Sequence, residues 1–120
     1  MITLIENMPE NIVGFAYAGQ VTATDYESVL FPAIENAAKK SKRLKILCRV
    51  ENDFSGLSLG ALKDDFQLGF GYFKDWEKIA ILSDKDWLNH LTKAIGFIVP
   101  AKVKVFGSSK MDEAVKWLSE

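Results

Sequence analysis

The chain has 120 residues, of which 48% are hydrophobic and 26% are charged, and its formal net charge is -1. This length and composition predict a single globular domain, residues 1–120, with enough apolar side chains for a core. The balanced charge gives no general electrostatic reason to bind nucleic acid or an anionic membrane surface. The single cysteine, Cys48, excludes an internal disulfide and a cysteine-rich zinc site. Its apolar neighbours predict a buried, unreactive thiol.

Nothing in the sequence predicts export or membrane insertion. The first residues, MITLIENMPEN, lack the basic start and the long apolar stretch of a secretory signal. The apolar stretch before Pro100 is far shorter than the roughly 20 residues that a membrane helix needs. We therefore expect a soluble, cytoplasmic protein without integral membrane association.

Two strands are predicted first. Apolar and polar residues alternate over residues 2–6, and bulky and small side chains alternate over residues 12–18. Turn residues lie between them at 8–11, which predicts an antiparallel hairpin. The small side chains of the second strand, Gly14 and Ala16 among them, predict a close neighbour on that face of the sheet.

A helix follows the hairpin. Thr24 and Glu27 have the spacing of a capping box, in which Thr24 would be the N-cap. Apolar residues then recur at helical spacing to about Lys40. Pro32 lies inside this pattern and predicts a bend, because proline lacks an N–H group and crowds the preceding turn.

Three more strands are predicted in the rest of the chain. The nearly continuous apolar run at 44–50 predicts a central strand that is buried on both faces. Residues 78–82 predict a second buried strand, and residues 102–106 alternate basic with apolar side chains, as is typical of a sheet edge. With helices between them, the order is ββαβαβαβα. This order predicts an α/β fold with a mainly parallel sheet and helices on its faces.

The helix before the fourth strand crosses an unusual stretch, LGFGYFKDW, at residues 68–76. Apolar residues recur with a helical period from Leu59 to Phe73, so the stretch is predicted to end a core-facing helix. A phosphate-binding loop would need a GxGxxG pattern directly after a strand, and this pattern is absent. Gly69 and Gly71 within a helix predict that a neighbour packs very closely, and a second subunit is our favoured hypothesis.

Two further helices are expected. One begins at Ser83 and Asp84, with Asp84 as its cap, and runs to about residue 95. The last helix is expected after Gly107, with Ser109 and Asp112 as its capping pair.

Three stretches resemble the SpoIIAA-like family of small bacterial proteins: GQVTATDYESVLFPAIE, FGYFKDWEKIAILSDKDW and VKVFGSSKMDEAVKWL. The matching features are a Thr/Asp-Tyr helix start, a helix that enters a strand through WEKIAIL, and a Ser-Asp-x-x-Trp turn. The resemblance covers nearly the whole chain. It implies a STAS-like fold, similar also to lipid-binding CRAL-TRIO domains, with a mostly parallel five-stranded sheet, an antiparallel edge strand and four helices.

The resemblance also draws attention to Ser55. STAS domains of the anti-sigma-factor antagonist type carry a phosphorylated serine after the third strand, and Ser55 lies at the corresponding place. The usual Asp-Ser-Ser-Gly core is here Asp53-Phe54-Ser55-Gly56, and the helical pattern begins nearer Ser58, which leaves Ser55 in a loop. Two roles stay open for Ser55, namely a regulated phosphorylation site and a plain turn serine.

Ligands of mainly parallel sheets bind beyond the carboxyl ends of the strands. The candidate ligand- or partner-binding residues at that edge are Asn52, Asp53, Phe54, Ser55, Gly56, Ser83 and Asp84. No spacing of histidine, cysteine and acidic residues predicts a metal site. The lone His90 has no predicted nucleophile beside it, so the sequence predicts no catalytic residue and no cofactor.

One basic cluster remains, formed by Lys39, Lys40, Lys42, Arg43 and Lys45. It follows the end of the first helix, where cations complement the helix dipole, so we expect a solvated surface. The alternative is contact with membrane headgroups or nucleic acid.

Three functions follow as hypotheses. The favoured one is a non-enzymatic, STAS-like regulatory or protein-interaction module that acts as a homodimer. The alternative is a carrier of a small apolar or lipid-like ligand, by analogy with CRAL-TRIO domains, with a cavity lined by aromatic residues such as Phe54, Phe66, Phe70, Phe73 and Phe97. An enzyme is the least favoured, and fold analogy alone decides none of them.

Overall fold

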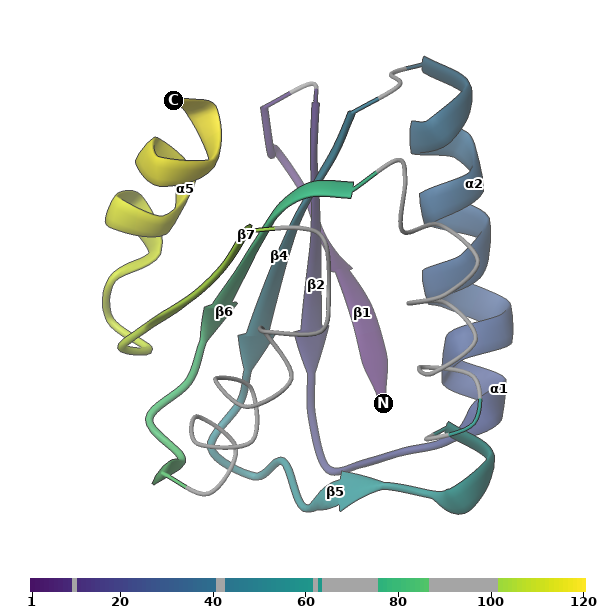
Figure 1. The fold of residues 1–120 in the computed structure, drawn as a ribbon. Coiled ribbons are helices and arrows are strands. Elements are labelled where there is room, and N and C mark those ends of the chain that lie inside the picture. Colours follow the sequence, from purple (N-terminus) through teal and green to yellow (C-terminus); the bar gives the residue numbers. More distant parts are fainter. Residues whose placement is uncertain (10, 41–42, 62, 64–75, 87–101) are drawn as a thin grey trace.

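The structure of the protein is a computed structural model, and it describes residues 1–9, 11–40, 43–61, 63, 76–86 and 102–120. A five-stranded sheet forms its centre, with the strands in the order β1-β2-β4-β6-β7 (Figure 1). These strands are β1 (Ile2–Ile5), β2 (Ile12–Tyr17), β4 (Leu44–Val50), β6 (Trp76–Leu82) and β7 (Lys102–Phe106).

The pairing of the strands confirms the predicted architecture. β1 pairs with β2 in antiparallel fashion, and every other neighbouring pair of this sheet is parallel. β4 lies in the middle, as its continuous apolar run predicted, and β7 lies at one edge, as its alternation predicted. The fold is therefore α/β, with a mostly parallel sheet and one antiparallel edge strand.

The first helical segment consists of α1 (Ala23–Asp25), a π-helical turn η1 (Tyr26–Leu30) and α2 (Phe31–Lys40). The N–H of Phe31 donates to the carbonyl oxygen of Tyr26, five residues earlier, directly before Pro32. Proline crowds the carbonyl group of the preceding turn, and a wider turn gives its ring more room. The structure thus has a widened turn where the sequence predicted a bend.

The predicted cap of this helix was wrong. The N-cap is Thr22, whose hydroxyl accepts a hydrogen bond from the N–H of Asp25 at 3.4 Å. The carboxylate of Asp25 in turn accepts from the N–H of Thr22 at 2.8 Å. The sequence holds two overlapping patterns of a threonine followed three residues later by an acid. The chain uses the earlier pattern rather than Thr24 and Glu27.

A second sheet was not predicted. It consists of two short parallel strands, β3 (Gln20–Val21) and β5 (Gly56–Leu57). Gly19 precedes β3 with a φ of 56°, and Gly56 begins β5 with a φ of 131°. Side chains with a Cβ rarely adopt these conformations, so the two glycines allow the chain to turn into each strand.

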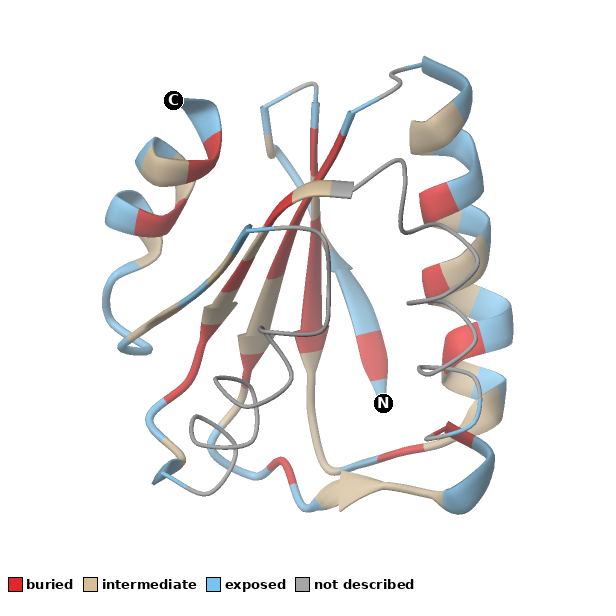
Figure 2. Cartoon of the chain, viewed as in Figure 1, coloured by how far each residue is buried: buried red, intermediate tan, exposed pale blue. Residues whose placement is uncertain are grey.

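Buried side chains form two clusters, one on each face of the main sheet (Figure 2). The first packs against the 23–40 helical segment and includes Phe15, Tyr26, Leu30, Ile34, Ile46 and Phe54. The second packs against α5 (Met111–Ser119) and consists of Ile12, Leu47, Ala80, Leu82, Ala114 and Leu118.

The small face of β2 has the close neighbours that the sequence predicted. A Cβ atom added to Gly14 would lie 3.1 Å from the Cβ of Ile5 and 3.1 Å from the Cγ of Met8. The bulky residues of β2, Phe15 above all, point to the opposite face and join the first cluster.

Three local predictions need correction. α5 has Lys110 as its N-cap, without a side-chain cap bond, so Ser109 and Asp112 do not form the expected cap. A hydrogen bond from the N–H of Lys110 to the carbonyl oxygen of Gly107 (3.0 Å) closes a turn and delays the start of the helix. Cys48 is half-buried rather than buried. Lys45, expected on a solvated surface, is buried because it points from a central strand towards the α5 side.

Some predictions lie outside the described residues. Residues 59–61 and 63 are helical, as is Asp86, but the rest of the two middle helices is not described, so the number of four helices stays a prediction. The LGFGYFKDW stretch up to residue 75 and His90 also lie outside, as do Phe66, Phe70, Phe73 and Phe97. In the part of the chain that is described, no helix is long and apolar enough to cross a membrane.

Candidate functional site

The carboxyl ends of β4 and β6 lie at one edge of the main sheet, because these two strands are parallel neighbours. The segment after β4 carries Asn52 to Gly56, and the segment after β6 carries Ser83 and Asp84. Figure 1 shows both segments at the lower end of the view, with β5 running along that end. The topology therefore brings all the predicted site residues to the same edge.

Main-chain hydrogen bonds fix the segment after β4. The N–H of Ser55 donates to the carbonyl oxygen of Gly19 at 2.9 Å, and that of Ser58 donates to Val21 at 2.8 Å. The carboxylate of Asp53 accepts from the N–H of Gly19 at 3.3 Å. Asp53 thus stabilises the turn into β3, and the backbone is held on both sides of the Ser55 side chain.

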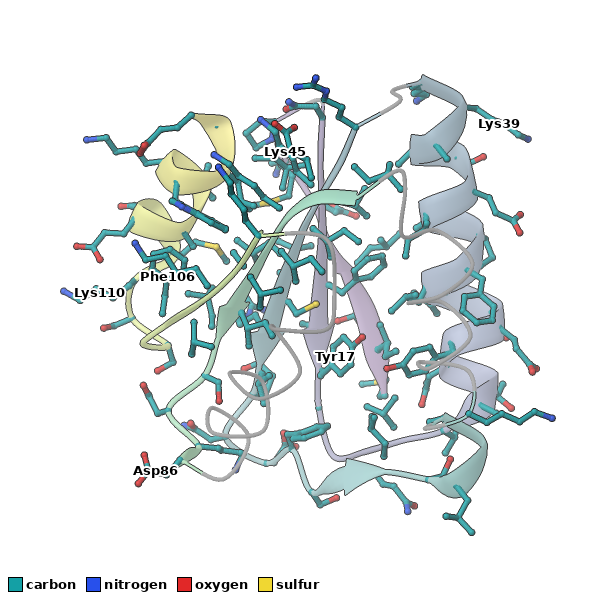
Figure 3. All side chains as sticks on the ribbon, viewed as in Figure 1. Tyr17, Lys39, Lys45, Asp86, Phe106 and Lys110 are labelled. Atoms are coloured by element: carbon teal, nitrogen blue, oxygen red, sulfur yellow. The ribbon has the colours of Figure 1, made fainter. Side chains whose placement is uncertain are left out.

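Phe54 anchors the same segment in the core. Only 7% of its surface is exposed, and it belongs to the first buried cluster. Its ring makes an edge contact with that of Tyr17, with the centroids 6.3 Å apart. Tyr17 makes a second edge contact, with the fully buried Tyr26, and these ring centroids are also 6.3 Å apart. Tyr17 lies on the face of the sheet that the 23–40 helical segment covers (Figure 3). Phe54 is therefore an internal anchor of the loop.

Ser55 points out of this fixed segment. Its side chain is exposed, and its hydroxyl makes no hydrogen bond with any residue that the structure describes. The next helix is capped by Ser58, whose hydroxyl accepts from the N–H of Ala61 at 3.1 Å. This confirms the prediction that the helix begins near Ser58 and leaves Ser55 in the loop.

The two candidates after β6 have different surroundings. Ser83 is buried, and its hydroxyl accepts from the N–H of Lys85 at 3.1 Å, so Ser83 shapes the start of the following segment. Asp84 is exposed, and its carboxylate accepts from the N–H of Ser108 at 3.0 Å and from the Ser108 hydroxyl. These two bonds hold the pKa of Asp84 below its ordinary value. Among the described residues, Asp84 therefore bonds to Ser108, in the turn before α5.

Lys85 links the two halves of the edge. Its ammonium donates to the carbonyl oxygen of Asn52 at 3.1 Å. Lys85 is a site residue that the sequence did not predict, and its position three residues after β6 is the one signal that could have marked it. The structure thus groups Asp53 and Ser55 beside β3 and β5, and Ser83 and Asp84 beside β7, with Lys85 and Asn52 between them.

The exposed part of this edge is polar and includes Asn52, Asp53, Ser55 and Asp84. Asp53 and Asp84 each accept a main-chain hydrogen bond, from Gly19 and from Ser108 respectively, so both carboxylates hold the backbone of neighbouring turns. Over the described ranges, no three residues among His, Cys, Asp and Glu are grouped so that they could hold a metal ion. This edge is therefore an exposed polar surface on a backbone that main-chain hydrogen bonds fix.

Comparisons with known proteins agree with this fold. A sequence model of the SpoIIAA-like family matches residues 12–119. The fold is similar to that in the crystal structure of an uncharacterized protein from the DUF3478 family, with a SpoIIAA-like fold, from Shewanella loihica PV-4. The TM-score is 0.80 at 25% sequence identity, over 98% of this chain and 93% of that chain. None of the curated proteins matches the chain.

Proposed function

The chain belongs to the SpoIIAA-like family. We propose that it is a non-enzymatic, cytoplasmic regulatory module that acts by binding another protein. The observation that carries the proposal is the exposed Ser55 on a backbone that is fixed on both sides. The binding surface comprises the exposed residues of the loop after β4, Asn52, Asp53 and Ser55.

The fixed backbone favours recognition because a loop that is already ordered loses little conformational entropy on binding. Phe54 below the loop and the bonds from Ser55 and Ser58 to the β3 segment supply that order. The exposed groups are an amide, a carboxylate and a hydroxyl, which is the polar composition of a regulated, reversible interface.

The surroundings of Ser55 also favour contact over catalysis. A nucleophilic serine needs a base within hydrogen-bond reach. None of the described residues makes a hydrogen bond with the Ser55 hydroxyl, so none is placed to take its proton. The carrier hypothesis has less support, because Phe54, the one aromatic of its proposed cavity within the described ranges, is packed into the core.

We also propose that the chain forms a homodimer, because Gly69 and Gly71 in the predicted helix would let a second subunit pack closely. Size-exclusion chromatography with light scattering tests it directly. A dimer mass that persists at low micromolar concentration supports this part of the proposal, and a strictly monomeric chain removes it.

Quantitative affinity capture from cells that express the protein natively tests the binding surface. The baits are the wild-type chain, Ser55→Arg, and the control Ser28→Arg, which changes an exposed serine of the helical segment. The proposal predicts a partner retained by the wild type and by Ser28→Arg and lost with Ser55→Arg. That partner, purified, should bind the wild type directly. Equal capture by all three baits would show that the loop is not the binding surface.

A further inference from the structure

Three lysines lie in register across three neighbouring strands. Lys45 of β4 pairs with Lys78 of β6, and Lys78 pairs with Lys102 of β7. Paired residues of adjacent strands point to the same face of a sheet and stand about 5 Å apart. All three lysines lie in the first half of their strands, so the row is near the amino-terminal ends of these parallel strands. Ser55 lies beyond the opposite, carboxyl ends.

The row faces α5. Lys78 donates from its ammonium to the carbonyl oxygen of Trp117 at 2.9 Å and to the main-chain oxygen of Glu120 at 3.0 Å. The same ammonium lies 5.1 Å from the centroid of the Trp117 ring. These contacts place Lys78 at the negative end of the α5 dipole, which stabilises its charge.

Lys45 has no such compensation among the residues that the structure describes. It is as buried as Lys78, each with 8% of its surface exposed. Its ammonium makes no hydrogen bond or ion pair with any described residue. The nearest acid in sequence on the neighbouring strand, Glu77, pairs with Arg43 at 3.6 Å. Figure 3 labels Lys45 at the end of the molecule where α5 terminates.

This arrangement is electrostatically unfavourable without a further group. Like charges directly opposite each other on adjacent strands destabilise a sheet, and a buried charge without a partner costs more than an exposed one. Lys102 is exposed and adds a third positive charge to the row. An anion held between Lys45 and Lys78 would offset both effects.

We propose that Lys45 and Lys78 form a binding site for a phosphate group, with Lys102 at its rim. An ammonium has three N–H donors. Lys78 donates two of them to Trp117 and Glu120, which leaves one, and none of the three of Lys45 is donated to a described residue. A phosphate offers several charged oxygens and can accept charge-assisted hydrogen bonds from both ammonium groups at once. The ligand is inorganic phosphate or the phosphate of a small phosphomonoester.

Amide NMR titration of the whole chain tests the site. Inorganic phosphate and glycerol phosphate are added separately, at an ionic strength held constant with sodium chloride. The proposal predicts saturable shifts at the amides of Lys45, Lys78 and Lys102. Saturation by inorganic phosphate alone assigns the site to the free anion, and tighter binding of glycerol phosphate assigns it to the phosphomonoester.

The variants separate the site from general salt effects. Lys45→Met keeps the aliphatic stem and should weaken binding at least about tenfold, because it removes a charge-assisted bond. Lys102→Met changes an exposed residue, so it should leave the stability nearly unchanged and should weaken binding less than Lys45→Met. Lys39→Met, on the exposed surface of α2, should bind as the wild type does. Shifts that never saturate, shifts unchanged in both Lys45→Met and Lys102→Met, or tighter binding of succinate than of either phosphate would each overturn the proposal.

Discussion

The carboxylate of Asp84 accepts hydrogen bonds from both the N–H and the hydroxyl of Ser108, and it thereby ties the turn after β6 to the turn after β7. The N–H of Ser83 adds a bond to the carbonyl oxygen of Phe106 at 2.9 Å. Together these bonds extend the pairing of two parallel strands beyond their ends. At the carboxyl ends of these strands, the turn after β6 and the turn after β7 are therefore bonded to each other.

Acid should loosen this connection. The bonds from Ser108 lower the pKa of Asp84, so the folded state favours the ionised carboxylate. A lowered folded-state pKa gives a stabilising contribution that is complete above about pH 5 and is lost as the pH falls through the lowered pKa. We expect the free energy of unfolding to fall below about pH 4 in the wild type, and to fall less steeply in Asp84→Asn. Urea unfolding from pH 3 to pH 7 measures this, with Asp112→Asn as an exposed control. Identical pH profiles for the wild type and Asp84→Asn would contradict the assignment.

The helix cap can be tested with two neighbouring threonines. Thr22→Ala removes the hydroxyl that accepts from the N–H of Asp25, and should cost about 1 kcal/mol of unfolding free energy. Thr24→Ala removes an exposed hydroxyl within the first turn and should change the stability by less than about 0.5 kcal/mol. Thermal or urea unfolding distinguishes the two. A larger loss with Thr24→Ala would mean that the later capping pattern is the one in use.

Backbone conformation should matter more at Gly56 than at Gly107. Gly56 has a φ of 131°, a region that is almost closed to residues with a Cβ, so Gly56→Ala should cost about 1–3 kcal/mol. A Cβ at Gly107 would meet its nearest atom, a carboxylate oxygen of Asp84, at an ordinary 3.5 Å. Gly107→Ala should therefore be close to neutral. Equal stabilities of the two variants in urea unfolding would argue against the described path of β5.

Phe54 should control the order of the proposed binding loop. Truncation of a buried phenylalanine typically costs about 3–5 kcal/mol, so Phe54→Ala should be strongly destabilising. Phe54→Leu keeps most of the volume and should cost less. In Phe54→Leu we expect hydrogen exchange to accelerate at the amides of Ser55 and Ser58, which bond to the β3 segment, relative to amides of β4. Uniform acceleration across the chain would show that Phe54 supports the whole core and not the loop in particular.

The main sheet could be predicted because each of its strands has a residue pattern of its own that extends over four or more residues. The apolar run at 44–50 marks a central strand by itself, and the alternation at 102–106 marks an edge strand. β3 and β5 have two residues each, too few for any periodicity, and they form through the conformations of Gly19 and Gly56. The capping pattern occurred twice, and only the path of the chain after β3 selects Thr22.

For the candidate site, the sequence predicted the position of the residues but not their contacts. Its residues could be placed at one edge of the sheet because the carboxyl ends of parallel strands converge. Their individual partners depend on contacts between distant segments, such as Asp84 with Ser108 and Lys85 with Asn52. Lys45 is the clearest example, since it was grouped with its basic neighbours in sequence. The register that places it beside Lys78 cannot be read from either strand alone.

Phosphorylation of Ser55 would act as a switch on the proposed binding surface. A phosphate adds nearly two negative charges beside the carboxylate of Asp53, whose bond to the N–H of Gly19 holds the turn. Because Ser58 and not Ser55 caps the following helix, the phosphate would gain little from the helix N-terminus and would mainly repel Asp53. We therefore expect phosphorylation to weaken partner binding by at least about tenfold, in line with the repulsion that like charges produce at an interface. Intact-mass analysis of the protein from its native cells should show a phosphoform that Ser55→Ala abolishes and Ser28→Ala retains. Partner binding is then compared for the phosphorylated and unphosphorylated chains, and tighter binding of the phosphoform would reverse the proposed direction of the switch.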